Sequence, residues 1–325
     1  MKKVIITGGA GFIGRHLVKR LLSCNRYSIV IISDGFAPND NFLADKKSDQ
    51  VNHISLYTAD IRDRKTISKI FRNENAETCI HLAAKINVID SIKNPDMTMD
   101  INVKGTQNVL EACYESQINN FIFASSAAVY GNVMELPITE NHNLNPLSPY
   151  GMSKMLAENH VSSYGKLKKI QNVITLRMFN VYGTGQSSEA DVITRFALRL
   201  SKRLPPVIYG DGKHTRDFIS VDDVVESFLL STKLMETDDK IKQIHSPRVF
   251  NIGTGIPTSI NELTKKMIEI FGLDLQPVYK GGNDERVISH SYADITKAND
   301  SLHFVPKKSV DVGLKEMIRQ MPFQE

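Results

Sequence analysis

The chain has 325 residues, of which 41% are hydrophobic and 23% are charged, a composition typical of a globular protein and not of a disordered or fibrous one. Its 40 basic and 36 acidic residues give a net charge of +4, and no clustered basic patch of the kind that binds nucleic acid is found. Since no apolar run reaches the roughly 18 residues of a membrane span, we expect a cytoplasmic protein of one large or two modest domains, with no membrane partner.

Short apolar runs alternate with helix-length segments through the first half of the chain. The runs are rich in Val, Ile and Phe with little polar alternation, which is typical of parallel strands covered on both faces. This order predicts an α/β fold with a Rossmann-type doubly wound parallel sheet and right-handed crossovers. The predicted strands lie at 3–7, 28–33, 54–58, 78–82, 120–124 and 172–177, and the predicted helices at about 12–24, 63–73, 95–117 and 149–167.

The pattern changes after about residue 180, where glycine and proline interrupt the chain and strands are hard to assign. One more strand is predicted at 249–252, where the chain returns to the sheet. We therefore predict a larger domain formed by 1–180 and about 218–252, and a smaller α+β domain formed by 181–217 and 253–325. The polar stretch 37–52 is predicted to be a loop.

The three cysteines lack the spacing of a zinc site or of a disulfide framework. Cys24, Cys79 and Cys113 are each predicted to be small core residues. Among the histidines, His81 at a strand end is predicted to be structural, and His214 is predicted to lie at the surface. No metal site is expected.

A glycine-rich turn follows the first predicted strand and opens the first helix. Gly8, Gly11 and Gly14 form a GxxGxxG pattern, in which the backbone can approach a pyrophosphate and the helix N-terminus offers free N–H groups. Such turns also occur for packing alone, but Asp34 ends the second strand about 20 residues later, where a carboxylate can accept hydrogen bonds from ribose hydroxyls. Its charge would repel a 2′-phosphate, which favours NAD over NADP. Asp60, after the third strand, suits an adenine amino group or, alternatively, a helix N-cap.

Tyr150 and Lys154 are spaced i and i+4, on one face of the helix that Pro149 opens. A cation near a phenol favours the phenolate, so Tyr150 is predicted to have a lowered pKa and to accept a proton near neutral pH. A YxxxK pattern arises often by chance, but Ser125 and Ser126 end an earlier strand, at the edge where doubly wound sheets hold their ligands. A serine hydroxyl there can hydrogen-bond the reacting oxygen.

These features are joined, in order along nearly the whole chain, by His81–Ala84, SSAAVYG at 125–131, RMFNVYG at 177–183 and GDGKHTRDF at 210–218. The chain resembles the extended short-chain dehydrogenases/reductases of the nucleotide-sugar epimerase/dehydratase group, and is most similar to UDP-hexose 4-epimerases. The resemblance implies a hydride shuttle through a transient 4-keto sugar, with NAD held tightly and regenerated in each turnover. It makes the smaller domain the nucleotide-sugar-binding one and implies a homodimer that pairs the helices near 95–117 and 149–167.

Individual roles follow from the same resemblance. Tyr150 is the acid/base at the sugar 4-hydroxyl, Lys154 binds the nicotinamide ribose and tunes Tyr150, and Ser126 is the catalytic serine. The cofactor-binding residues are Gly8, Gly11, Phe12, Ile13, Gly14, Asp34, Asp60, Ile61, Leu82, Ala83, Ala84, Lys85, Asn102, Tyr150 and Lys154. The substrate-binding residues are Ser126, Tyr150, Asn180, Arg216, Arg286 and Ser291, with Asn180 and Arg216 at the nucleotide diphosphate.

Departures from the group's patterns bear on the reaction. Dehydratases usually carry an acid pair just after the serine position, and UDP-glucuronate decarboxylases tend to carry a glutamate there. This chain has Ala127 and Ala128, which cannot transfer protons, so elimination is disfavoured and a reaction confined to C4 remains. The phosphate-binding arginine of relatives is shifted two places to Arg286, or Arg286 is a solvated surface residue.

The residue at the Ser291 position gates the sugar pocket in 4-epimerases. A small serine there predicts that UDP-N-acetylglucosamine and UDP-N-acetylgalactosamine are accepted beside or instead of UDP-glucose and UDP-galactose. A dehydratase, a reductase or a UDP-glucuronate epimerase of the same family is an alternative. A non-catalytic NAD(H)-binding regulator is another, although such regulators tend to lose the tyrosine or the lysine.

Overall fold

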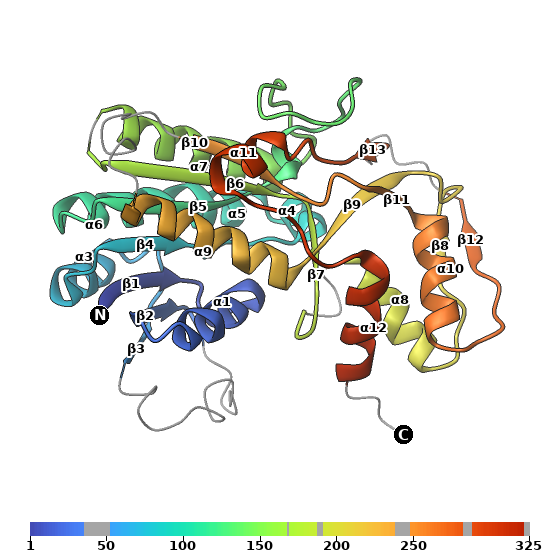
Figure 1. Cartoon of the computed structure of the whole chain (residues 1–325). Helices are drawn as coiled ribbons and strands as arrows, with labels where there is room; N and C mark the ends of the chain where they lie inside the picture. The colour runs from blue at the N-terminus through green and yellow to red at the C-terminus, as the bar shows by residue number, and fades with distance from the viewer. Residues whose placement is uncertain (36–52, 168, 187–190, 238–247, 282–287, 322–325) are drawn as a thin grey trace.

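A seven-stranded parallel sheet forms the larger part of the computed structural model, which describes residues 1–35, 53–167, 169–186, 191–237, 248–281 and 288–321 (Figure 1). The strand order is β10-β6-β5-β4-β1-β2-β3, so the winding reverses between β1 and β4, as the prediction of a doubly wound sheet requires. The strands are β1 (Lys2–Thr7), β2 (Tyr27–Ser33), β3 (Ile54–Thr58), β4 (Thr78–His81), β5 (Asn120–Ser126), β6 (Asn172–Met178) and β10 (Arg248–Ile252).

Helices cover both faces of this sheet. One face lies under α1 (Phe12–Ser23), α9 (Val221–Thr237) and α11 (Thr296–Leu302), and the other under α3 (Arg64–Glu74), α6 (Gly105–Glu115) and α7 (Pro149–Lys166). Successive strand residues point to opposite faces, so Ile5 packs into the α3/α6 layer and Ile6 into the α1/α9 layer. This double burial is why the strands are apolar runs without polar alternation.

The helix predicted over 95–117 is divided. It comprises α5 (Pro95–Met99), a π-helical turn η2 (Asp100–Lys104) and α6, and it follows the unpredicted short helix α4 (Val88–Lys93). A π-helical turn carries one more residue than an α-helical turn, and such turns are frequent at functional sites.

A second part of the chain, built around a smaller sheet, stands beside the carboxyl ends of the parallel sheet, at the right of Figure 1. Its central strand β9 (Thr215–Ser220) pairs with β7 (Asn180–Tyr182), β11 (Pro257–Ser259) and β13 (His290–Ser291). A separate hydrophobic cluster joins these strands to α8 (Val192–Ser201), α10 (Ile260–Ile270), α12 (Val310–Gln320) and β8 (Val207–Tyr209), and β8 pairs with β12 (Val278–Lys280). The predicted return to the sheet at 249–252 is confirmed, because β10 pairs with β6.

Other predictions have mixed outcomes. Cys79 and Cys113 are buried as predicted, but Cys24 is partly exposed because it lies just after the end of α1, so the core prediction for Cys24 is wrong. The predicted loop at 37–52 lies outside the described residues. No helix in the described part of the chain combines the length and the apolar character needed to cross a bilayer.

Candidate active site

A continuous cleft of about 1830 Å³ runs between the carboxyl ends of the parallel strands and the second part of the chain. Parallel strands present their following loops at this edge, so residues far apart in sequence meet there. Of the predicted site residues, the cleft is lined by Gly8, Gly11, Phe12, Ile13, Gly14, Asp34, Asp60, Ile61, Leu82, Ala83, Ala84, Lys85, Ser126, Tyr150, Lys154, Asn180 and Arg216. Arg286 lies outside the described residues.

The glycine turn fits a pyrophosphate. Gly8 has φ +71°, and a Cβ there would lie 2.7 Å from the backbone nitrogen of Ala83. At Gly14 the absence of a side chain is required for packing instead, because a Cβ there would lie 2.3 Å from the Gly8 carbonyl oxygen. Helix α1 has Gly11 as its N-cap, without a side-chain cap or an acidic residue in its first turn. The first amides of α1 are therefore available to an anion, because Arg15 donates the first helical hydrogen bond, at 2.9 Å to Gly11.

Two carboxylates lie on the same side of the cleft. Asp34 is exposed just after β2. Asp60 is bound by the guanidinium of Arg62 at 2.6 Å, which holds the pKa of Asp60 below its usual value. The alternative interpretation of Asp60 as a helix cap is wrong, because Asp63 caps α3 by accepting a hydrogen bond from the backbone N–H of Thr66.

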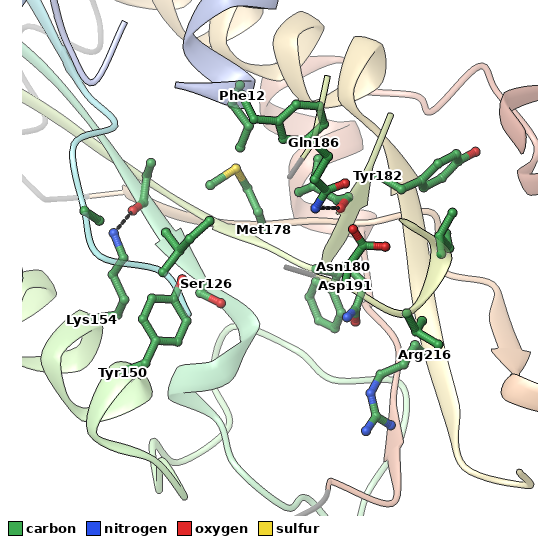
Figure 2. A pocket seen from close by; sticks show the side chains of 18 of the residues that line it. Phe12, Ser126, Tyr150, Lys154, Met178, Asn180, Tyr182, Gln186, Asp191 and Arg216 are labelled. Atoms are coloured by element: carbon green, nitrogen blue, oxygen red, sulfur yellow. Dashed lines mark hydrogen bonds between the residues drawn. The ribbon is translucent and has the colours of Figure 1, made fainter. Parts of the chain in front are cut away.

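Tyr150, Ser126 and Lys154 meet at the centre of the cleft (Figure 2). The Tyr150 phenol faces the Ser126 hydroxyl; burial raises the pKa of Tyr150, and the interaction with Ser126 lowers it. The Lys154 ammonium donates to the carbonyl oxygen of Ala124 at 2.9 Å, and burial lowers its pKa to about 8. The prediction that Lys154 lowers the pKa of Tyr150 is therefore wrong for this arrangement, because desolvation dominates and Ser126 is the group that favours the phenolate.

A buried polar network lies behind these residues. Arg177 and Glu158 form an ion pair at 2.7 Å, each side chain being 7% exposed, and Ser125 also donates to Glu158. Arg177 further donates to Tyr130 at 3.0 Å, whose hydroxyl donates to Asn251 at 2.6 Å. The network thus joins the SSAAVYG and RMFNVYG segments to α7. Glu158 was missed by the sequence analysis, although its i+4 spacing from Lys154 could have shown it.

Asn102 does not line the cleft, contrary to its predicted cofactor contact, although the adjacent Ile101 does. Its buried amide instead accepts from the backbone N–H of Lys85 at 2.7 Å and donates to the Lys85 carbonyl at 2.9 Å. The same amide donates to Ser153 at 2.9 Å, and Ser153 donates to the carbonyl of Tyr150 at 2.7 Å. Asn102 therefore connects the cleft wall at Lys85 with the helix that carries Tyr150.

The opposite wall comes from the second part of the chain. Asn180 is exposed on β7, Arg216 extends from β9 and Asp191 precedes α8, and all three line the cleft (Figure 2). Arg216 donates to the carbonyl of Thr215 at 2.8 Å and has no carboxylate partner among the described residues, and burial lowers its pKa to about 10. Ser291 is buried beside Arg216 in the β9/β13 register and does not itself line the cleft.

The histidines differ in their surroundings. His81 is buried, with its ring nitrogens 2.6 Å from the hydroxyl of Thr7 and 2.9 Å from that of Thr106, so its predicted structural role is confirmed. His214 is half-buried and lines the cleft, so the prediction of a surface position is wrong. The reason is that the loop before β9 turns into the cleft with Arg216.

Comparisons with known proteins agree with this fold. The family model described as GDP-mannose 4,6 dehydratase matches residues 5–317. A putative UDP-glucose 4-epimerase of Methanocaldococcus jannaschii is 39% identical, with 98% of each chain covered. The UDP-glucose 4-epimerase of Thermotoga maritima, solved with UDP-glucose, has a TM-score of 0.85 at 33% identity, covering 98% of this chain and 97% of that one. The dTDP-glucose 4,6-dehydratase DesIV of Streptomyces venezuelae, solved with NAD, has a TM-score of 0.86 at 26% identity, covering 98% and 96%.

Proposed function

The chain belongs to the GDP-mannose 4,6 dehydratase family of nucleotide-sugar epimerases and dehydratases, and from this premise we propose that it is an NAD-dependent UDP-hexose 4-epimerase. The proposed reaction interconverts UDP-glucose and UDP-galactose, and also the 2-acetamido sugars UDP-N-acetylglucosamine and UDP-N-acetylgalactosamine. The observation that carries the proposal is that Tyr150 and Ser126 face each other in the cleft, and that Ser126 is followed directly in the sequence by Ala127 and Ala128.

The glycine turn, Asp34 and the loop from Leu82 to Lys85 would hold NAD, with its pyrophosphate at the first turn of α1. Bound NAD supplies a reversible hydride acceptor for the hydrogen on C4 and a positively charged ring within the cleft. A positive charge in a buried site favours an ionised phenol, which offsets the effect of burial on Tyr150.

Tyr150 then removes the proton of the 4-hydroxyl as C4 is oxidised, and returns it when C4 is reduced on its other face. Ser126 hydrogen-bonds the reacting oxygen and holds the phenol in position. Lys154, which is fixed to the carbonyl of Ala124, supplies positive charge behind Tyr150. A 4,6-dehydratase would also need a group to take the C5 proton and protonate the leaving oxygen at C6, and neither Ala127 nor Ala128 can do this.

The second part of the chain would hold the nucleotide diphosphate. Arg216 is a half-buried cation without a carboxylate partner among the described residues, so an anionic ligand would compensate its charge. Asn180 supplies amide hydrogen bonds on the same wall. The proposal that a 2-acetamido group is accepted rests on the resemblance and on the small size of Ser291, which lies beside Arg216 without lining the cleft.

We further propose a homodimer that pairs the helices α5 to α7 of two copies. Its support is that Met97 on α5 and Met152 on α7, two helices that pack against each other, remain 48% and 36% exposed. The molar mass in solution tests this, and a purely monomeric protein would contradict it.

Proton NMR of the purified protein with UDP-N-acetylglucosamine, and separately with UDP-glucose, tests the function without added NAD. Appearance of the anomeric signal of the 4-epimer is the expected result, because NAD is regenerated in each turnover. A product lighter than the substrate by one water would indicate a dehydratase. Consumption of added NADH would indicate a reductase. Retained NAD without turnover of either sugar nucleotide would contradict the epimerase for these sugars and leave a uronic acid substrate or a regulator.

A further inference from the structure

Two histidines at the nucleotide end of the cleft have no role in the proposed reaction. His214 precedes β9, His290 lies on β13, and both line the cleft together with Arg216. His290 lies opposite Thr215 in the sheet register, and its Nδ1 is 3.0 Å from the Thr215 hydroxyl. The His290 ring is therefore held against β9, the strand that carries Arg216. His214 precedes Arg216 by two residues in the same segment.

Positive charge gathers at this end of the cleft. Lys213 lines it as well, and the charges of Arg216 and His290 both disfavour protonation of His214, as does burial, so the pKa of His214 is lowered. Among the described residues, the acid that favours its protonation is Asp211, an exposed residue of the same loop that also forms an ion pair with Lys213 at 3.9 Å. Such mutual repulsion is relieved when an anion binds among the cations.

The other acids that the structure describes near Arg216 and the two histidines are engaged elsewhere. Asp217, next to Arg216 on β9, accepts hydrogen bonds from the backbone N–H groups of Thr254, Gly255 and Ala293 and is fully buried. At the start of α8, Asp191 caps the helix by accepting a hydrogen bond from the backbone N–H of Thr194, and Arg195 also lines the cleft there. On α10, Glu262 takes part in the capping box of Ser259.

We propose that His214 and His290 complete, with Arg216, a subsite for the diphosphate of the nucleotide sugar, and that protonation of the two histidines tightens its binding. The inference rests on the proposed function, because it assumes a nucleotide diphosphate ester as ligand. A bound diphosphate favours the imidazolium form of His214, whereas burial and Arg216 disfavour it in the free protein. Affinity should therefore increase as the pH falls toward and below the usual histidine pKa of 6.5.

The test is calorimetric binding of a UDP-hexose that lacks the C4 hydroxyl, which cannot be turned over. Its phosphates are diesters, so the charge of the probe is constant over the range. For the wild type we expect up to about tenfold tighter binding at about pH 5 than at about pH 8, because a one-unit pKa shift has its full effect on binding only below the pKa of the free protein. H214Q and H290Q should each lose part of this pH dependence, and H214Q/H290Q should lose nearly all of it. His303→Asn, at the C-cap of α11, is the matched control and should behave as wild type.

The outcomes separate this inference from the function. Equal pH dependence in the wild type and in H214Q/H290Q, or none in the wild type, overturns the subsite even if epimerisation is observed. If no epimerisation is observed but the pH dependence of binding is present and is lost in the variants, the subsite proposal is supported and the proposed reaction is contradicted. Bound NAD retained by each single variant shows that it is folded, so the single variants decide the test if the double variant does not fold.

Discussion

Asn102 offers a sharp test of how the cleft is held in shape. Its side chain makes three hydrogen bonds, two with the backbone of Lys85 and one with Ser153. Each such bond contributes about 1 kcal/mol net, so Asn102→Ala should lower the free energy of unfolding by roughly 3 kcal/mol. Asn108→Ala is a matched control, because this buried residue of α6 makes only two hydrogen bonds, to the carbonyls of Ile61 and Arg62, and should cost roughly 2 kcal/mol.

The two variants should differ more in activity than in stability. Without Asn102, Lys85 and Tyr150 lose their common support, and a displacement of about 1 Å at a reacting group can lower kcat by about 100-fold. We expect kcat of Asn102→Ala to fall by about tenfold to 100-fold. KM for the nucleotide sugar should change little, because Asn180 and Arg216 extend from another sheet.

Urea unfolding gives the stabilities, and initial rates with UDP-glucose give kcat and KM. The reasoning is refuted if Asn102→Ala loses no more stability than Asn108→Ala and keeps its kcat. A fall in kcat equal in both variants would also refute it, because the effect would then be one of general destabilisation.

The remaining predictions concern the reacting groups and their support. Tyr150→Phe should lower kcat by about 10³-fold or more while leaving unfolding by urea unchanged. The pKa of Lys154 is about 8 in the folded protein and 10.5 ordinarily, so between these two pH values Lys154 is protonated in the unfolded chain and largely deprotonated in the folded protein. Stability should thus rise from pH 8 to pH 10, and Lys154→Met should abolish the rise in urea unfolding. Glu158→Gln leaves the Arg177 charge buried without its partner and should cost about 3–5 kcal/mol in the same assay, a loss below about 1 kcal/mol being the contrary result. Gly14→Ala should yield protein without bound NAD, read from the absorbance of the denatured supernatant.

The sequence predicts the parallel sheet well because its strands are buried on both faces and are therefore uniform apolar runs. The predicted and observed bounds of β1 to β6 differ by at most two residues. The small sheet around β9 was missed for the opposite reason, since β7, β11 and β13 have two or three residues each, too few to show a period.

The candidate site shows a similar boundary between what spacing can and cannot predict. The i, i+4 spacing correctly places Tyr150 and Lys154 on one helix face, but it cannot show that the ammonium is bound by the carbonyl of Ala124. That partner comes from another strand, and burial of both groups then reverses the expected direction of the Tyr150 pKa. The predicted contact of Asn102 fails for the same reason, because its amide is already satisfied by Lys85.

The π-helical turn η2 changes the direction in which the side chains of the surrounding helix point. Its extra residue rotates everything before it by about 100° relative to everything after it. This lets α5 pack against α7 while α6 packs against α3. Deleting one residue from 100–104 would allow a continuous α-helix, but one of these two faces, or Asn102, would then turn away from its partner. We therefore expect the number of residues in this segment to be as constrained as the identity of any of them.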